Sequence, residues 1–364
     1  MPGKQSIIEI AREAGVSPST VSRVLNNHPD VSPETYRAVK AVIDRLGFLP
    51  NAAARSLVSK RSRTLAFVTS EIAFYPTLIL AQVEEQARQR GYKLFVNVIN
   101  SALNPPSAED DRVLEDLLSY QVDGIIWAVA ETTHSFDLWR GRLASLSTPV
   151  VCISARFIDS LTFVSVDNRW GGHLVAEHLL AQGYRHLGTI TGPMFEMATV
   201  ERHAGWMEVL AGAGLPPAPE QVVQGDWTPA GGERAFLQLY EQFPQVDGIF
   251  VHNDLMAVGV LSAMHRLGLR VPEQVGVAGF DNRSETAFLL PPLTSVSHHF
   301  EEVGLHAVAE IDRLIQLSAQ DRAQEPPRGI WIRPELVARE SSMRTEKGGP
   351  GADLAHSTGQ AAAG

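Results

Sequence analysis

The sequence has only one cysteine, Cys152, among its 364 residues. A single cysteine excludes an intrachain disulfide framework and any CxxC redox or zinc motif. No run of 18 uncharged apolar residues occurs, so we expect no transmembrane helix and no membrane partner. The first residues lead directly into a segment dotted with Glu and Arg, without the apolar stretch of a secretory signal. Together these absences predict a cytoplasmic protein.

Signatures of enzymes are missing as well. The sequence contains no GxSxG nucleophile elbow, no GxxxxGKS/T phosphate loop and no GxGxxG motif after the first expected strand. Cys152 lies within an apolar strand, where a buried and inert thiol is expected. The adjacent His298 and His299 would point apart on a strand, and no second cluster supports a metal. We therefore expect no enzyme activity, no catalytic residue, no metal site and no cofactor.

Charge is divided unevenly along the chain. The net charge is −10, but residues 1–63 contain ten Lys/Arg and five Asp/Glu and carry +5, which leaves −15 for the remainder. A small basic head on a larger acidic body is typical of a nucleic-acid-binding segment joined to another unit.

The head is predicted to form three short helices. Ser6 begins the first helix as part of a capping box, and Gly15 ends it. Ser17 and Ser32, each followed by proline, are suited to cap the second and third helices, and Gly47 ends the third. The apolar positions expected on the inner faces are Ile7, Ile10, Ala11, Ala14, Val21, Val24, Leu25, Tyr36, Val39, Val42, Ile43 and Leu46.

The first two helices and the glycine turn between them have the spacing of a helix-turn-helix. In this motif the start of the second helix meets base edges in the major groove. Arg23 suits a forked hydrogen bond to guanine, and its alternative is a surface ion pair with a carboxylate. The hydroxyls there suit phosphate oxygens, although they also serve as caps. The candidate DNA-contacting residues of the head are Ser17, Pro18, Ser19, Thr20, Ser22, Arg23, Asn26 and Ser32.

From residue 65 onward, strand and helix patterns alternate, which predicts parallel sheets covered by helices on both faces. A faint repeat, VDGII at 122–126 and VDGIF at 246–250, indicates two similar lobes. The expected strands are 65–69, 94–98, 124–129, 150–153, 163–166, 187–191, 248–251 and 275–278. The expected helices lie around 77–90, 108–120, 171–182, 202–213, 230–242, 255–267 and 301–317.

Motifs along nearly the whole chain carry a family resemblance. They are IAREAGVS at 10–17, TVSRVLN at 20–26, VSPET at 31–35, PNAAARSL at 50–57, VDNR at 166–169, NDLMA at 253–257, GFD at 279–281 and PPLT at 291–294. In this order they resemble the LacI/GalR (lactose-repressor/galactose-repressor) family of bacterial transcriptional regulators. The resemblance implies an N-terminal all-α helix-turn-helix headpiece and an α/β, two-lobed effector domain like that of type I periplasmic binding proteins.

The resemblance also implies how the chain is divided. Residues 1–58 form the DNA-binding domain, in which 50–58 are a hinge helix that folds on operator DNA. Within it Ala54 and Arg55 contact DNA, and Leu57 wedges into the minor groove. A linker at 59–63 leads to the body at 64–342, and 343–364 form a disordered tail. Lobe one is expected at about 64–165 and 292–325, and lobe two at about 166–291 and 326–342.

The effector site is carried over from the family in the same way. Arg202, Asn253 and Asp281 match family positions that contact effector, and such groups bond sugar hydroxyls. Trp227 matches an aromatic residue that offers a flat face to a sugar ring, although it could be a core residue; Phe74 is expected on the lobe-one side. Asp254 is left out because it looks like a helix N-cap. Ser154 stands where the lactose-repressor type has an acidic residue.

These implications add up to a sequence-specific DNA-binding repressor of carbohydrate-utilisation genes. It is expected to bind a pseudo-palindromic, double-stranded operator as a homodimer, under allosteric control by a small sugar or glycoside bound between the lobes. One alternative is a nucleoside- or purine-responsive regulator of the same architecture. Purine-responsive members enclose the base with aromatic side chains, and no comparable pair is evident here. The other alternative is a sugar-binding transport protein. The basic head counts against it, because such a protein has no need for a DNA-binding segment.

Overall fold

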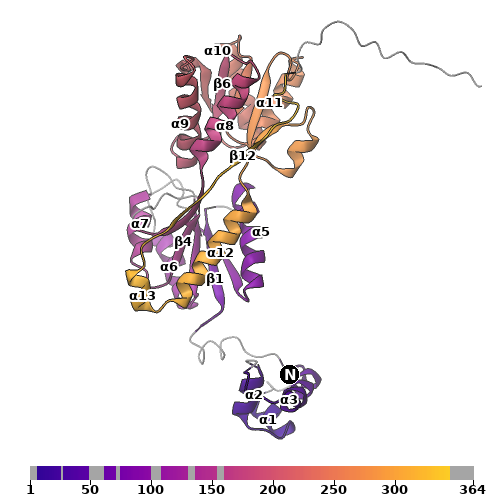
Figure 1. The fold of residues 1–364 in the computed structure, drawn as a ribbon, viewed down its shortest axis with the longest axis vertical. Helices are drawn as coiled ribbons and strands as arrows, with labels where there is room; N and C mark the ends of the chain where they lie inside the picture. Colours follow the sequence, from indigo (N-terminus) through magenta and orange to yellow (C-terminus); the bar gives the residue numbers. More distant parts are fainter. Residues whose placement is uncertain are drawn as a thin grey trace, which may run out of the picture.

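The computed structural model describes residues 6–25, 28–48, 61–70, 74–99, 108–129, 136–153 and 160–344. These residues form a small helical head and a body of two α/β lobes, as the sequence predicts (Figure 1). Within these ranges no helix is long and apolar enough to cross a membrane. The same ranges contain no group of His, Cys, Asp and Glu side chains suited to hold a metal ion.

The head consists of α1 (Ile7–Glu13), α2 (Pro18–Leu25) and α3 (Pro33–Leu46). Each helix begins at a serine, Ser6, Ser17 or Ser32, whose Oγ accepts a hydrogen bond from the backbone N–H three residues later, at 3.1–3.3 Å. Gly47 ends α3 with a φ of 62°, a left-handed conformation that glycine adopts without steric penalty. The predicted caps are therefore confirmed.

A compact apolar cluster holds the three helices together. Its buried members are Ile10, Ala11, Val21, Val24, Val39 and Ile43. Tyr36 lies outside this cluster and is 37% exposed, so the prediction that it belongs to the inner face is wrong. It lies in the first turn of α3, away from the deeply buried Val39 and Ile43.

Lobe one is built on a parallel six-stranded sheet in the order β11-β5-β4-β3-β1-β2. Helices α5 and α12 pack on one face of the sheet, and α6 and α7 pack on the other. Cys152 is fully buried on the second face, as predicted. The strands are β1 (Thr64–Thr69), β2 (Lys93–Val98), β3 (Gly124–Ala128), β4 (Val150–Ile153), β5 (Thr162–Val166) and β11 (Gly329–Ile332). The helices are α5 (Phe74–Gln89), α6 (Ala108–Ser119), α7 (Phe136–Ala144), α12 (Phe300–Gln316) and α13 (Ala319–Gln324).

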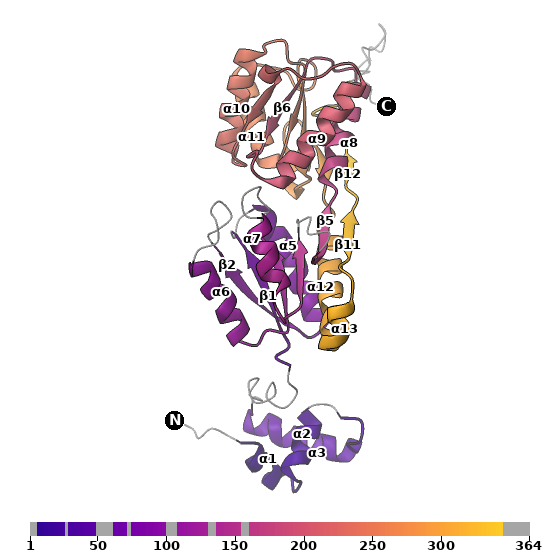
Figure 2. The same cartoon turned by 90° about the vertical axis from the view of Figure 1, so that its left-hand side faces the viewer.

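Lobe two repeats this design and lies on the far side of lobe one from the head (Figure 2). Its strand order is β12-β10-β9-β8-β6-β7, in which only β12 is antiparallel to its neighbour. Helices α8 and α9 pack on one face, and α10 and α11 pack on the other. The strands are β6 (Leu187–Thr191), β7 (Val222–Gln224), β8 (Gly248–Val251), β9 (Gly276–Asp281), β10 (Thr294–Ser297) and β12 (Glu335–Val337). The helices are α8 (Asn168–Ala181), α9 (Met197–Gly212), α10 (Pro229–Gln242) and α11 (Asp254–Arg266), with short 3-10 turns at Pro219–Gln221 and Ser284–Phe288.

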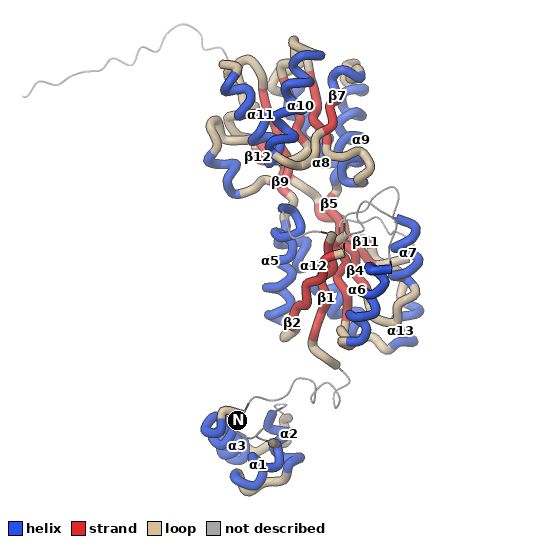
Figure 3. Tube along the Cα trace, turned by 180° about the vertical axis from the view of Figure 1, so that it is seen from behind, coloured by secondary structure: helices blue, strands red, loops and turns tan. Residues whose placement is uncertain are grey.

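Three crossings join the lobes: β5 to α8, β10 to α12, and β11 to β12 (Figure 3). They correct two expected boundaries. Strand β10, which was expected in lobe one within 292–325, pairs with β9 of lobe two. Strand β11, which was expected in lobe two within 326–342, pairs with β5 of lobe one. Backbone pairing decides which lobe these four-residue strands join, and their apolar pattern does not reveal it.

The repeated VDG sequence has the same structural task in both lobes. The carboxylate of Asp123 accepts hydrogen bonds from the backbone N–H groups of Ser62 and Arg63, at 2.8 and 3.0 Å, just before β1. The carboxylate of Asp247 accepts them from Arg185 and His186, at 3.0 and 2.8 Å, just before β6. Each aspartate therefore fixes the entry of the first strand of its lobe. Next to the Asp123 carboxylate and its two backbone partners, Arg61 donates hydrogen bonds to the last turn of α12.

Two glycines allow α8 and α9 to cross in close contact. A Cβ atom at Gly172 would lie 2.1 Å from the carbonyl oxygen of Arg202, and one at Gly205 would lie 1.9 Å from that of Arg169. Because these neighbours are backbone atoms of the facing helix, a side chain would have to push the helices apart.

We predict that Gly172→Ala lowers the free energy of unfolding by about 1–3 kcal/mol or more, the usual penalty of overpacking. Gly212→Ala is the matched control in α9, because nothing lies within 4 Å of the added Cβ. That change should be neutral or stabilise the protein by up to about 1 kcal/mol. Chemical denaturation followed by circular dichroism measures both, and equal stabilities would contradict the close crossing.

Candidate functional site

The candidate DNA-contacting residues of the head form an exposed, hydroxyl-rich surface at the start of α2. The Oγ of Ser17 lies 2.7 Å from that of Ser19 and 2.8 Å from the Oγ1 of Thr20, so the three hydroxyls form one hydrogen-bonded group. Ser17, Pro18, Ser19, Arg23 and Ser32 are exposed, and Thr20 and Ser22 are half-buried. Such a surface can donate several hydrogen bonds to a polyanion.

Arg23 is on this surface, one turn beyond the hydroxyl group. In the described part of the head, the ion pairs are His28–Asp30, Lys40–Asp44 and Arg45–Glu13, and none involves Arg23. The alternative of a structural ion pair for Arg23 therefore gains no support within these residues. Asn26, Ala54, Arg55 and Leu57, the other candidate DNA contacts, lie outside the described residues.

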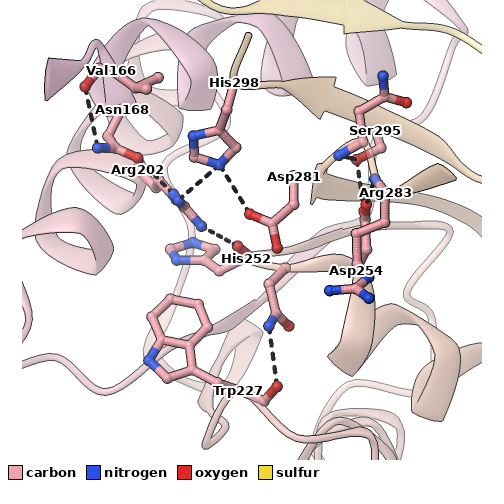
Figure 4. Close-up of polar contacts among 12 residues, drawn as sticks. Val166, Asn168, Arg202, Trp227, His252, Asp254, Asp281, Arg283, Ser295 and His298 are labelled. Atoms are coloured by element: carbon pink, nitrogen blue, oxygen red, sulfur yellow. Dashed lines mark hydrogen bonds and ion pairs between the residues drawn. The ribbon is translucent and has the colours of Figure 1, made fainter. Parts of the chain in front are cut away.

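In the body, the candidate effector residues gather at the carboxyl ends of the lobe-two strands (Figure 4). Trp227 follows β7, Asn253 follows β8 and Asp281 ends β9, while Arg202 reaches the same place from α9. Ligands of open α/β sheets bind at this edge. Phe74 begins α5, but its side chain lies outside the described residues, as does Ser154.

Arg202 is the centre of the cluster and is only 4% exposed. Its Nε donates a hydrogen bond to Asn168 Oδ1 at 2.8 Å, and its Nη1 donates to the carbonyl oxygen of His252. The guanidinium carbon lies 3.7 Å from the centre of the Phe280 ring and 5.8 Å from that of Trp227. Hydrogen bonds and aromatic faces thus compensate a buried positive charge.

Asp281 has an unusual backbone, with a φ of 115°, which non-glycine residues rarely adopt. Its Oδ1 lies 2.9 Å from Nε2 of His298, a residue that the sequence analysis considered only as a metal ligand. Burial lowers the pKa of His298 below its ordinary value, and the charge of Arg202 lowers it further, although Asp281 opposes both. These effects together favour the neutral form of the imidazole. Strained backbone of this kind is concentrated at functional sites.

Asn253, rather than Asp254, caps helix α11. Asn253 is the N-cap of α11, because its Oδ1 accepts a hydrogen bond from the N–H of Met256 at 2.9 Å. The amide of Asn253 also donates to the carbonyl oxygen of Trp227 at 3.1 Å, which fixes both residues. Asp254, expected as the N-cap, is instead the first helical residue and is buried, with Ser295 Oγ at 2.6 Å. Burial raises the pKa of Asp254, and the charge of Asp281 adds to this effect.

Trp227 is half-buried rather than a fully enclosed core residue. Its indole Nε1 donates a hydrogen bond to Glu196 Oε1 at 3.0 Å. A Cβ atom at Gly192 would lie 2.1 Å from the indole, so the glycine makes room for the ring. The hydrogen bond and the close fit against Gly192 therefore hold the ring in place.

Comparison with known proteins agrees with this architecture. The sequence family described as bacterial regulatory proteins, lacI family, matches residues 6–51, and the periplasmic binding protein-like domain matches residues 176–342. The HTH-type transcriptional repressor PurR of Actinobacillus pleuropneumoniae is 31% identical over 346 residues, which cover 94% of this chain and 99% of that protein. The HTH-type transcriptional regulator CelR of Thermobifida fusca is 33% identical over 343 residues, which cover 91% and 96%.

Solved structures give the same result. The Lac repressor dimer bound to operator and the anti-inducer ONPF has a TM-score of 0.81 at 26% identity, covering 94% of this chain and all of that one. The complex of CelR with cellobiose has a TM-score of 0.67 at 29% identity, covering 93% and 99%. Because the head, the body and relatives more than 30% identical all agree, this chain belongs to the lacI family of bacterial regulatory proteins and is a DNA-binding transcriptional regulator.

Proposed function

We propose that the protein is a homodimeric repressor of carbohydrate-utilisation genes that acts in the cytoplasm. A small sugar or glycoside binds between its lobes and releases it from a pseudo-palindromic operator. The observation that carries this proposal is the convergence of Arg202, Asn253 and Asp281 beside the half-buried Trp227. In a closed cleft, unpaired sugar hydroxyls cost about 1–3 kcal/mol each, so a sugar site needs polar partners of this kind.

The chemistry of the cluster favours a sugar. The carboxylate of Asp281 accepts hydrogen bonds from hydroxyl groups, the Arg202 guanidinium donates them, and an indole face packs against the apolar face of a pyranose ring. The CelR relative with a known complex binds cellobiose, which has these features. The PurR relatives supply the second candidate, a purine, and the same experiment tests it.

Control of DNA binding follows from the position of the cluster. Asn168, which binds Arg202, begins α8 directly after the first crossing, and His298, which binds Asp281, lies in the second. A ligand that binds better to one arrangement of the lobes shifts the population toward it, typically by about 1–3 kcal/mol of coupling. In the dimer, this movement would separate the two hinge segments and lower operator affinity.

We predict that Arg23→Ala relaxes base preference more than it weakens nonspecific binding. A forked contact with guanine is worth about 1–3 kcal/mol of discrimination, whereas phosphate contacts do not depend on sequence. Competition gel shifts with operator and scrambled DNA measure the ratio of affinities. Arg37→Ala, an exposed arginine of α3, is the control. Full operator selectivity in the Arg23 variant would remove it from the base-reading surface.

We predict that the wild-type protein binds cellobiose or a related glycoside, and that Asp281→Ala abolishes this binding while operator affinity persists. The variant should therefore remain on DNA at sugar concentrations that release the wild type. Calorimetry and gel shifts with cellobiose, hypoxanthine and guanine provide the test, with Glu241→Ala as an exposed control on α10. Binding of a purine alone would replace the sugar proposal by the purine one.

The proposed dimer has a candidate surface at the free edge of lobe one. Strand β2 is the last strand of its sheet, and Phe95, Val96 and Val98 on it are 40–42% exposed. Tyr120 is 64% exposed and meets Phe95 edge to face, with ring centres 5.8 Å apart. An apolar edge strand invites pairing with another chain, so a protein that stays soluble must cover it.

We predict that Phe95→Lys weakens the dimer, because a buried lysine without a partner opposes association. Analytical ultracentrifugation over a range of concentrations measures the dissociation constant. Leu237→Lys on α10 is the matched control, since Leu237 is also 42% exposed but belongs to the other lobe. Unchanged association of the Phe95 variant would place the interface elsewhere.

A further inference from the structure

We infer that His298 is a positioning residue that orients the Asp281 carboxylate for effector and transmits its occupancy to the second crossing. Neither the family matches nor the relatives assign a role to this side chain. The inference rests on the small-molecule site proposed above and deepens it, because it names the element through which that site acts on the lobes.

The two contacts of Nε2 in His298 favour a proton on this nitrogen. Nε2 lies 2.9 Å from Asp281 Oδ1 and 3.4 Å from Nη2 of Arg202. Arginine can only donate, so Nε2 cannot accept from Arg202 and donate to Asp281 at the same time. The shorter contact to a carboxylate selects a protonated Nε2 that donates to Asp281. The ring therefore directs the carboxylate, and Arg202 is a neighbouring charge rather than a partner of this nitrogen.

Two aromatic residues from different lobes hold the ring in place. His298 is 1% exposed and lies directly after β10. Its ring stacks on Phe300, the first residue of α12 in lobe one, with centres 5.1 Å apart and planes 15° from parallel. Phe280, next to Asp281 in β9 of lobe two, meets it edge to face at 4.9 Å. The imidazole therefore packs between α12 of lobe one and β9 of lobe two, and a movement between these elements changes at least one of the two contacts.

A similar hydrogen-bonded connection exists at the first crossing. This parallel supports a hydrogen-bonding role for His298 rather than a role in packing alone. Asn168 accepts the hydrogen bond from Arg202 and donates one to the carbonyl oxygen of Val166 at 3.2 Å, across the end of β5. Both charged groups of the candidate site, Arg202 and Asp281, thus bind a residue that belongs to a crossing (Figure 4). Ligand binding and lobe position share these hydrogen bonds.

The test compares variants that keep or remove the donor. His298→Gln can place an amide N–H near the position of Nε2, whereas His298→Leu fills the space without a donor. We expect His298→Leu to weaken cellobiose binding by about tenfold or more, the usual effect of losing a hydrogen bond to a charged group. Sugar should also release less DNA from this variant than from the wild type. His298→Gln should restore most of both responses.

His299→Asn is the matched control at the same crossing. The His299 side chain faces Glu335 at 3.9 Å rather than Asp281, and asparagine tolerates its φ of 52°. This variant should bind and release like the wild type. Equal losses in the Gln and Leu variants, or full sugar response in the Leu variant, would overturn the role of His298 as a donor. Thermal unfolding monitors the folding of each variant.

A measurement without ligand separates this inference from the proposed function. Nitrogen-15 spectra of histidine-labelled wild-type protein report which ring nitrogen carries the proton. At pH 7 His298 should carry it on Nε2, and Asp281→Ala should shift this resonance. A proton on Nδ1 would contradict the inference even if cellobiose binds. If cellobiose and purines both fail to bind the wild type, the proposed effector class fails, and the tautomer still decides the assignment of His298.

Discussion

The buried guanidinium of Arg202 determines which groups can surround it in lobe two. A charge that is 4% exposed must be compensated by hydrogen bonds and aromatic contacts, or it would destabilise the fold by several kcal/mol. Asn168 and the carbonyl oxygen of His252 supply acceptors, and Phe280 supplies an aromatic face. These partners come from α8, the end of β8 and β9, so the position of one side chain depends on the assembly of most of lobe two.

The close crossing of α8 and α9 is the structural condition for this arrangement. Gly172 faces the carbonyl oxygen of Arg202 itself, and Gly205 lies one turn further along α9. A larger residue at either position would displace the helix that carries the arginine. The stability of this lobe and the geometry of the candidate effector site are therefore coupled, because the packing that holds the helices also orients the Arg202 guanidinium.

Sequence reasoning found the elements whose signal is local. Fully buried strands such as β4 and β6, and the capped helices of the head, match the expected ranges closely because propensity and burial agree there. Strands β7, β10, β11 and β12 were not predicted, because none of them contains an uninterrupted apolar run as long as the four residues of β4. The same reason explains the two misplaced lobe boundaries. Arg202, Asp281, Trp227 and Asn253 were found through family motifs. His298 was missed as a partner of Asp281, because only the third dimension brings β10 beside β9.

The two ends of helix α12 lie at different functional parts of lobe one. It begins at Phe300, against the ring of His298, and its seventeen residues end at Gln316, where Arg61 of the segment entering β1 is bound. An α-helix rises 1.5 Å per residue, so α12 spans about 25 Å. Packed along its length against α5 and the sheet, it connects the candidate effector cluster at one end with the segment that enters β1 at the other. A tilt of a few degrees at the first end becomes a displacement on the order of 1–2 Å at the second.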